Sequence, residues 1–143
     1  GRSVKISDLV GEKLSEDFVN SVFESLSRDS RWRKVFSSCC FLLPFTNESF
    51  QSQYLLVSEY ADETFCEELE RELLKSHHYK LARTLGQLAE LKLKTVNQLI
   101  SKTQSFFCQQ KEMKLGDLKD FHLLADQELA WDLLYSLDFK SPV

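Results

Sequence analysis

The chain has 143 residues, with 18 Lys and Arg against 22 Asp and Glu, and its formal net charge is −4 at pH 7. This length suits one domain with a core of its own, and the weakly acidic balance excludes a global field that attracts nucleic acid. Four Gly and two Pro are too few for the many tight turns of a β-sandwich or barrel, so the composition favours a few long elements.

Two helices are predicted in the first third of the chain. Ser15 can cap the first helix, over about residues 16–28, and Leu14 can pack against its first turn. Apolar residues recur at helical spacing over about 31–42, which predicts a second helix. Pro44 ends it, because the residue before a proline is pushed out of the helical region.

The next segment, residues 50–60, is ambiguous. Its aromatic and β-branched content is typical of a strand, but Phe50, Tyr54 and Val57 also fall on one helical face. A lone strand leaves its backbone groups unpaired, and the only other candidate strand is 40–45. We therefore favour a helix and keep open a small β-hairpin within residues 40–60.

The longest periodic run extends from Tyr79 to Glu112, after a helix that Asp62 caps. The run contains one Gly and no Pro, and its length of about 34 residues corresponds to a helix of about 50 Å. Gly116 is predicted to stop it. The remaining segment, 118–139, is expected to form two helices that meet near 125–126.

Together these elements predict an all-α fold, an irregular bundle of six or seven helices around one long central helix. Residues 1–143 are expected to be a single helical domain excised from a longer protein, since the chain begins with Gly-Arg-Ser and its one methionine is Met113. No apolar run approaches the roughly 20 residues that cross a bilayer, and no signal peptide opens the chain. We therefore expect an intracellular protein of the cytoplasm or nucleus, away from the membrane.

Lys92 lies inside the apolar stripe of the predicted central helix, one turn from Leu88 and one from Val96. A bare ammonium in a core costs on the order of several kcal/mol, so the lysine needs a partner or access to water. Three arrangements stay open. The charge reaches water while the stem lies along apolar neighbours, or it pairs with Asp126 or Asp132, or it meets an acidic residue of a partner protein.

Trp131 and Tyr135 form a predicted aromatic pair on the last helix. They are four residues apart and lie away from the leucine face of that helix. Such a pair either packs under another helix of the domain or anchors an interface, where both residue types are enriched. Glu128, Asp132 and Asp138 would surround the pair with negative charge and favour a basic partner.

The one basic and aromatic cluster comprises Arg31, Trp32, Arg33 and Lys34. Its cations could contact phosphates while Trp32 stacks on a base. The simpler interpretation is a solvated helix end, because Trp32 also fits an apolar face with Val35. Nucleic acid is therefore not the partner that the sequence favours.

No catalytic, cofactor or metal site is predicted. His77 and His78 are adjacent and point in different directions on a helix, and His122 is the only other histidine, whereas a zinc site needs three or four ligands. No phosphate loop, serine elbow or metalloprotease motif is present. The cysteines are interpreted as reduced core thiols: Cys39, Cys40, Cys66 and Cys108.

The predicted function is a non-catalytic protein–protein interaction or scaffold domain, a subunit of a larger intracellular complex. It would dock another protein, in the form of a basic amphipathic helix, or its own copy in a homodimer. The residues expected to bind that partner are Trp131, Tyr135, Glu128, Asp132 and Lys92. The alternative is a nucleic-acid-binding or complex-assembly domain that uses Arg31–Lys34, and an enzyme ranks third.

Overall fold

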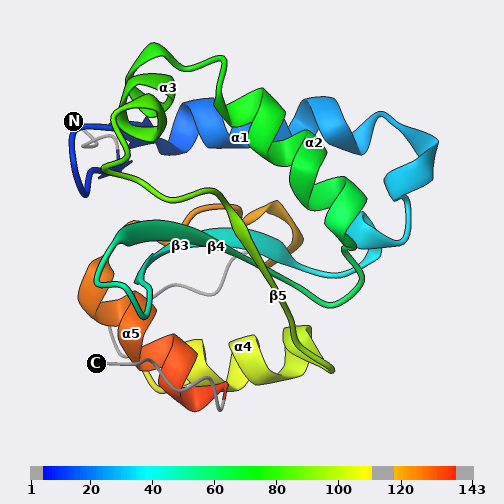
Figure 1. Cartoon of the computed structure of the whole chain (residues 1–143). Helices are drawn as coiled ribbons and strands as arrows, with labels where there is room; N and C mark the ends of the chain where they lie inside the picture. The colour runs from blue at the N-terminus through cyan, green and yellow to red at the C-terminus, as the bar shows by residue number, and fades with distance from the viewer. Residues whose placement is uncertain (1–4, 111–117, 138–143) are drawn as a thin grey trace, which may run out of the picture.

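The computed structural model describes residues 5–110 and 118–137, which form five α-helices, three short 3-10 helices and two β-sheets (Figure 1). The prediction of an all-α bundle of six or seven helices is therefore wrong. The small sheet pairs β1 (Ile6–Ser7) with β2 (Leu14–Ser15). The large sheet has the order β3-β4-β5, and its strands are β3 (Cys40–Thr46), β4 (Ser52–Ser58) and β5 (Lys92–Thr95).

Strand β4 is the centre of the large sheet. It pairs antiparallel with β3 through a hairpin, and parallel with β5. The far edge of β3 is lengthened by residues 122–124, because the Leu42 N–H donates to the His122 carbonyl and the Leu124 N–H donates to the Leu42 carbonyl, each at 2.9 Å. The hairpin that the sequence left open within residues 40–60 is thus present, at the centre of a sheet.

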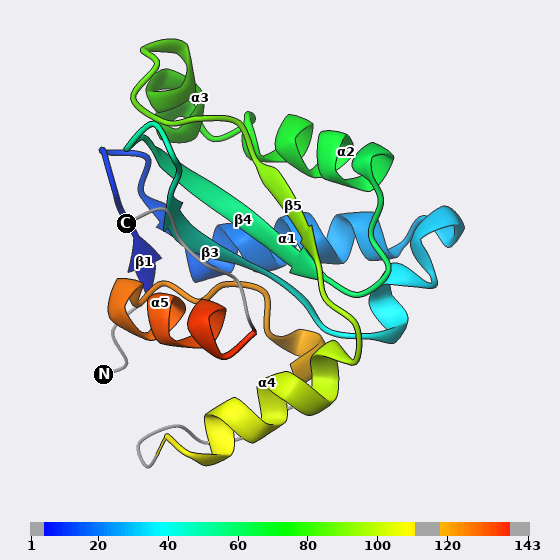
Figure 2. The same cartoon turned by 60° about the horizontal axis from the view of Figure 1, so that its bottom comes forward.

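Five α-helices cover the two faces of the sheet, as Figures 1 and 2 show. One face carries α1 (Glu16–Ser27), α2 (Glu63–Leu73) and α3 (His77–Thr84), and the other carries α4 (Leu99–Cys108) and α5 (Gln127–Ser136). Each layer encloses a buried apolar cluster, with residues of β3 and β4 alternating between the two. A strand buried on both faces is apolar at every position, which explains why 40–45 and 54–57 lacked the alternation of a surface strand.

The predicted central helix over 79–112 is broken into three elements. Helix α3 ends at Thr84, and Gly86 then takes the left-handed conformation with φ +72°. Lys92 lies on β5, and Gln98, with φ +56°, precedes α4. Helical periodicity in this region came from two short helices and a strand that follow one another.

Of the other predicted elements, some are confirmed and some are wrong. The helix expected over 31–42 is replaced by two 3-10 helices, Ser30–Trp32 and Val35–Ser37, and by the start of β3. Helix α5 begins after Asp126, where the division of the last segment was expected, and a 3-10 helix at Leu118–Asp120 precedes it. The predicted stop at Gly116 lies outside the described residues, as do Glu112, Met113 and Asp138. Within the described ranges no helix is long and apolar enough to span a membrane.

Candidate functional site

The predicted partner-binding residues do not form one surface. Tyr135 is 82% exposed on α5, whereas Trp131 is half-buried with its ring 6.5 Å from that of Phe45. Helix α5 packs on β3, and Lys92 is exposed on β5 at the other edge of the sheet. No ion pair joins Lys92 to a carboxylate that the structure describes, including those of Asp126 and Asp132, which are also exposed, as is Glu128.

The basic cluster is committed to contacts inside the domain. Trp32 is buried and meets the Phe65 ring edge-on at 5.2 Å, so it cannot stack on a base. Arg31 pairs with Asp29 at 2.7 Å and Glu68 at 2.9 Å. Lys34 lies over the Tyr60 ring at 4.4 Å, and Arg33 is exposed. The cluster therefore lacks the free aromatic face that the nucleic-acid alternative required, and two of its three cations contact other residues of the domain.

Histidines and cysteines do not assemble a reactive centre among the described residues, where no group of three or more His, Cys, Asp or Glu could hold a metal. His77 and His78 are exposed at the start of α3. Burial raises the pKa of the Cys39 thiol to about 11 and that of Cys66 to about 12, so both stay protonated at neutral pH. Cys108 is exposed, so its assignment to the core is wrong.

Three turns gather at one end of the large sheet, and we call them together the turn end. They are residues 8–13 between β1 and β2, residues 47–51 at the tip of the β3–β4 hairpin, and residues 85–88 after α3 (Figures 1 and 2). The Gln51 side-chain amide donates to the Gly86 carbonyl at 2.7 Å, and thereby joins the second turn to the third.

Glu12 holds the first turn in place through hydrogen bonds to its backbone. Its side chain is fully buried and accepts hydrogen bonds from the backbone N–H groups of Leu9 at 2.7 Å and Val10 at 2.8 Å, and from the Tyr54 hydroxyl of β4 at 2.5 Å. Burial and the nearby Glu12 carboxylate raise the pKa of Tyr54, so the hydroxyl remains a donor. A buried carboxylate needs such partners, and here the same bonds order the loop.

Backbone strain is concentrated at the turn end. Of the five described residues with positive φ, four lie there: Gly11 at +99°, Lys13 at +46°, Phe50 at +59° and Gly86 at +72°. Glycine adopts this conformation freely, but a residue with a side chain does so at a cost on the order of 1 kcal/mol or more. Lys13 and Phe50 are therefore held in a costly conformation by their surroundings.

Asn47 holds Phe50 in place. Its side-chain oxygen accepts from the N–H groups of Ser49 at 2.9 Å and Gln51 at 3.1 Å, and its carbonyl accepts from the Phe50 N–H at 2.9 Å. The Phe50 ring nevertheless makes little contact with the domain, because the residue is 74% exposed. The hairpin tip thus presents an aromatic side chain to the outside.

Leu81 and Leu85 add to the exposed apolar surface of the turn end. They lie one helical turn apart at the end of α3, and are 46% and 61% exposed. The bond from Gln51 to Gly86 places the neighbour of Phe50 against the neighbour of Leu85. We call Phe50, Leu81 and Leu85 the turn-end patch. Grouped exposed apolar side chains are typical of surfaces that bind another protein.

Sequence reasoning did not predict that these residues are exposed at the turn end. It placed Leu81 and Leu85 within the long helix expected over 79–112, and it placed Phe50 on a helical face. The turn itself was partly anticipated, because a β-hairpin within residues 40–60 was kept open. Nothing in the sequence indicates that Phe50 has a positive φ, since phenylalanine rarely adopts it.

Comparison with known proteins places the chain in a family. Residues 12–128 match the GH3 family C-terminal domain, a span that covers more than half of the chain and runs from Glu12 to the first turn of α5. No curated protein matches. The family match overturns the prediction of a scaffold or interaction module from an intracellular complex, together with its alternative. The chain belongs to the GH3 family, within which it matches the C-terminal domain.

Proposed function

We propose that this chain is a non-catalytic C-terminal domain of a larger GH3-family protein, and that its turn-end patch packs against the part of that protein that precedes it. A domain described as C-terminal in its family follows other parts of the polypeptide. Its partner is then a protein surface supplied by the same chain. The observation that carries the proposal is the exposed Phe50 ring on a left-handed backbone.

Energetics support an occupant for this surface. Full burial of a phenylalanine side chain contributes about 1.5–3 kcal/mol, and the left-handed backbone costs on the order of 1 kcal/mol or more. Within the described structure Phe50 gains little burial free energy and nothing offsets its backbone cost, since 74% of the residue is exposed. Packing of a second surface on the turn-end patch would recover the first term and offset the second.

The position of the turn end in the chain supports the same partner. The family match begins at residue 12, inside the first of the three turns. In a longer GH3 protein the preceding part is connected through Lys5 and β1, three residues before the first turn begins. Contacts between domains of one chain bury roughly 600–1,500 Å², which a patch of this kind could nucleate.

The absence of catalysis is part of the proposal. A nucleophile needs a neighbouring base or a lowered pKa, and the pKa values of the buried thiols Cys39 and Cys66 are raised instead. His122 donates toward a carbonyl rather than orienting a nucleophile. These observations favour a domain that assists another part of the protein.

The test compares Phe50→Asn with Tyr135→Asn in a polypeptide that carries the preceding GH3 region. Asparagine tolerates the left-handed backbone, so the first variant removes the ring and keeps the turn. Small-angle scattering should show an increased radius of gyration for Phe50→Asn and no change for Tyr135→Asn, whose ring is 82% exposed on α5. Equal radii in both variants would contradict the proposal. The alternative outcome is that the 143-residue chain forms concentration-dependent dimers that the Phe50→Asn substitution abolishes. That result would identify a second copy of the chain, and not the preceding region, as the partner of the turn-end patch.

A further inference from the structure

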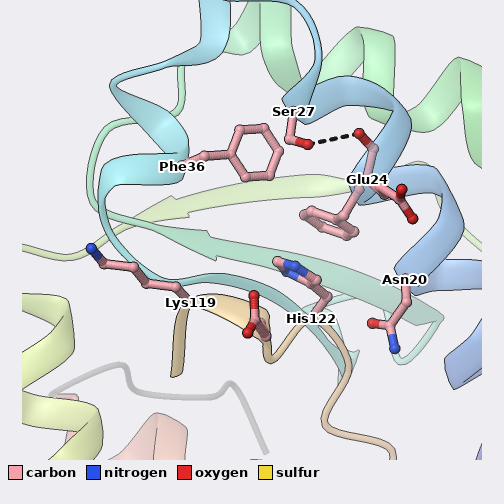
Figure 3. A pocket seen from close by; sticks show the side chains of 8 residues that line it. Asn20, Glu24, Ser27, Phe36, Lys119 and His122 are labelled. Carbon is pink, nitrogen blue, oxygen red and sulfur yellow. Dashed lines mark hydrogen bonds between the residues drawn. The ribbon is translucent and has the colours of Figure 1, made fainter. Parts of the chain in front are cut away.

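A pocket of about 580 Å³ opens between α1 and the segment that extends the sheet beyond β3 (Figure 3). Ligand sites in proteins have volumes of this order. Helix α1 supplies Asn20, Phe23 and Glu24 to its wall, and Phe36, Asp120 and His122 close the other sides. The pocket is separate from the turn end and plays no part in the proposed domain contact.

His122 is held rigidly at the pocket wall. Its carbonyl accepts from the Leu42 N–H at 2.9 Å, so the backbone is fixed to β3. The imidazole stacks on the Phe23 ring with centroids 4.4 Å apart and planes within 5°, and Phe36 meets it edge-on at 6.4 Å. Two aromatic neighbours and a sheet hydrogen bond therefore set the direction of the ring.

The hydrogen bond of His122 to β3 also determines its tautomer. Nδ1 lies 2.8 Å from the Cys40 carbonyl oxygen, which can only accept, so Nδ1 carries the proton. Burial lowers the pKa of His122 below its ordinary value of 6.5, and the ring is neutral at pH 7. Nε2 then presents a lone pair. Among the described residues, the one hydrogen bond of the His122 side chain is that of Nδ1.

Acceptors dominate the rest of the pocket. Glu24 and Asp120 contribute carboxylates, and the Ser27 hydroxyl already donates to the Glu24 carbonyl at 2.7 Å. Glu24 also pairs with Arg28 at 3.1 Å on the open side of the helix, where both side chains are mostly exposed and the pair is screened. Lys119 is the one cation of the lining, and Figure 3 shows its side chain extending away from His122.

We propose that this pocket binds a small organic cation that carries N–H donors on a flat apolar group, as in an amidine or an aromatic amine. The cation donates one N–H to His122 Nε2 and lies near the carboxylates of Asp120 and Glu24. Its flat part packs on Phe36, whose ring face attracts positive charge. An anion of the same shape would meet two carboxylates and a lone pair, and is excluded.

The test uses benzamidine as the probe, with benzamide and benzoate as neutral and anionic controls of the same shape. Long-range proton–nitrogen spectra of the whole chain report the His122 Nε2 resonance directly. Benzamidine should shift this signal to saturation, with a dissociation constant on the millimolar scale common for fragments of this size. Benzoate should leave it in place. Equal shifts from benzamide or benzoate, or no saturable shift with benzamidine, would overturn the proposal.

Two variants separate specific binding from general charge attraction. His122→Asn can keep a donor to the Cys40 carbonyl but lacks Nε2, and Asp120→Asn removes one carboxylate at an exposed position. Each should weaken benzamidine binding about tenfold, the effect of losing one charge-assisted hydrogen bond. Glu128→Gln, an exposed carboxylate on α5 outside the pocket, should not weaken it. If His122→Asn fails to fold, Asp120→Asn decides, and unchanged affinity there overturns the site.

Discussion

Phe50 and Tyr135 are the two most exposed large hydrophobic residues of the described structure, at 74% and 82%, yet their settings differ. Tyr135 sits on a regular helix, and water can satisfy its hydroxyl. Phe50 sits on a left-handed backbone that Asn47 locks through three hydrogen bonds. The contrast teaches that exposure alone does not identify an interface, whereas exposure combined with fixed strain points to one.

The largest expected effect comes from removing the carboxylate beneath the turn end. Glu12→Ala removes the acceptor of the half-buried Leu9 and Val10 N–H groups, and it leaves the buried Tyr54 hydroxyl with Ser7 Oγ as its remaining partner. We expect a loss of about 3–5 kcal/mol in the free energy of unfolding, measured by urea denaturation. Asp8→Ala removes a single exposed bond to the Gly11 N–H and should cost less than about 1 kcal/mol. Similar losses in both would show that the buried network does not order the loop.

A smaller loss is expected where α3 meets the third turn. The Arg83 guanidinium donates to Glu70 at 2.6 Å and to the Leu88 carbonyl at 3.1 Å, so it ties the turn to α2. Arg83→Met should lower the free energy of unfolding by about 1–2 kcal/mol, because the pair is partly buried. The exposed pair of Arg28 with Glu24 offers the control, and Arg28→Met should change stability by less than about 0.5 kcal/mol. Hydrogen exchange of the 85–88 amides should rise only in the first variant.

A gain in stability is expected when Phe50 is replaced by glycine in the 143-residue chain. Phe50→Gly removes the cost of a left-handed side-chain residue, and should raise the free energy of unfolding by up to about 1 kcal/mol. Tyr135→Gly should instead lower it by about 0.5 kcal/mol, because glycine has a low helix propensity and Tyr135 lies in the last turn of α5. Chemical denaturation distinguishes these opposite signs. A loss at Phe50 would mean that its ring stabilises the domain and needs no partner.

The smallest effect concerns pH and the imidazole away from the turn end. The pKa of His122 is lowered by burial in the folded state, so the unfolded chain binds a proton there first as the pH falls below 6.5. The contribution of His122 to the free energy of unfolding should therefore fall as the pH drops below 6.5, and it should be fully present above that pH. Glu24, Asp120 and Lys119 also face the pocket, so the comparison uses His122→Asn, which should show a weaker dependence between about pH 7 and pH 5. Parallel curves for the two proteins would contradict the assignment.

Local signals were predicted well from the sequence, and tertiary pairing was not. Ser15 caps α1 and Asp62 caps α2, with side chains accepting from Phe18 and Phe65, because capping depends on neighbouring residues alone. The large sheet was missed because its strands are buried on both faces and pair through contacts distant in sequence. Lys92, which did not fit the apolar stripe of the predicted central helix, belongs to a pattern that is typical of a strand. Leu91-Lys92-Leu93-Lys94 alternates with period two, and Leu93 packs inward while Lys92 is exposed.

The turn end could not have been predicted either, and the reason is different from that for the large sheet. Its character depends on where Phe50 and Leu85 point after three separate turns have come together, and on a φ value that phenylalanine seldom adopts. The pocket at His122 likewise required the pairing of 122–124 with β3, which no local pattern encodes.

The most direct measurement is hydroxyl-radical footprinting of Phe50, carried out on the short chain and on a polypeptide that includes the preceding GH3 region, with Tyr135 as the internal reference. The domain contact predicts that oxidation of Phe50 falls severalfold in the longer polypeptide while oxidation of Tyr135 stays the same. Equal oxidation of Phe50 in both would show that the turn-end patch remains uncovered, and would contradict the central claim.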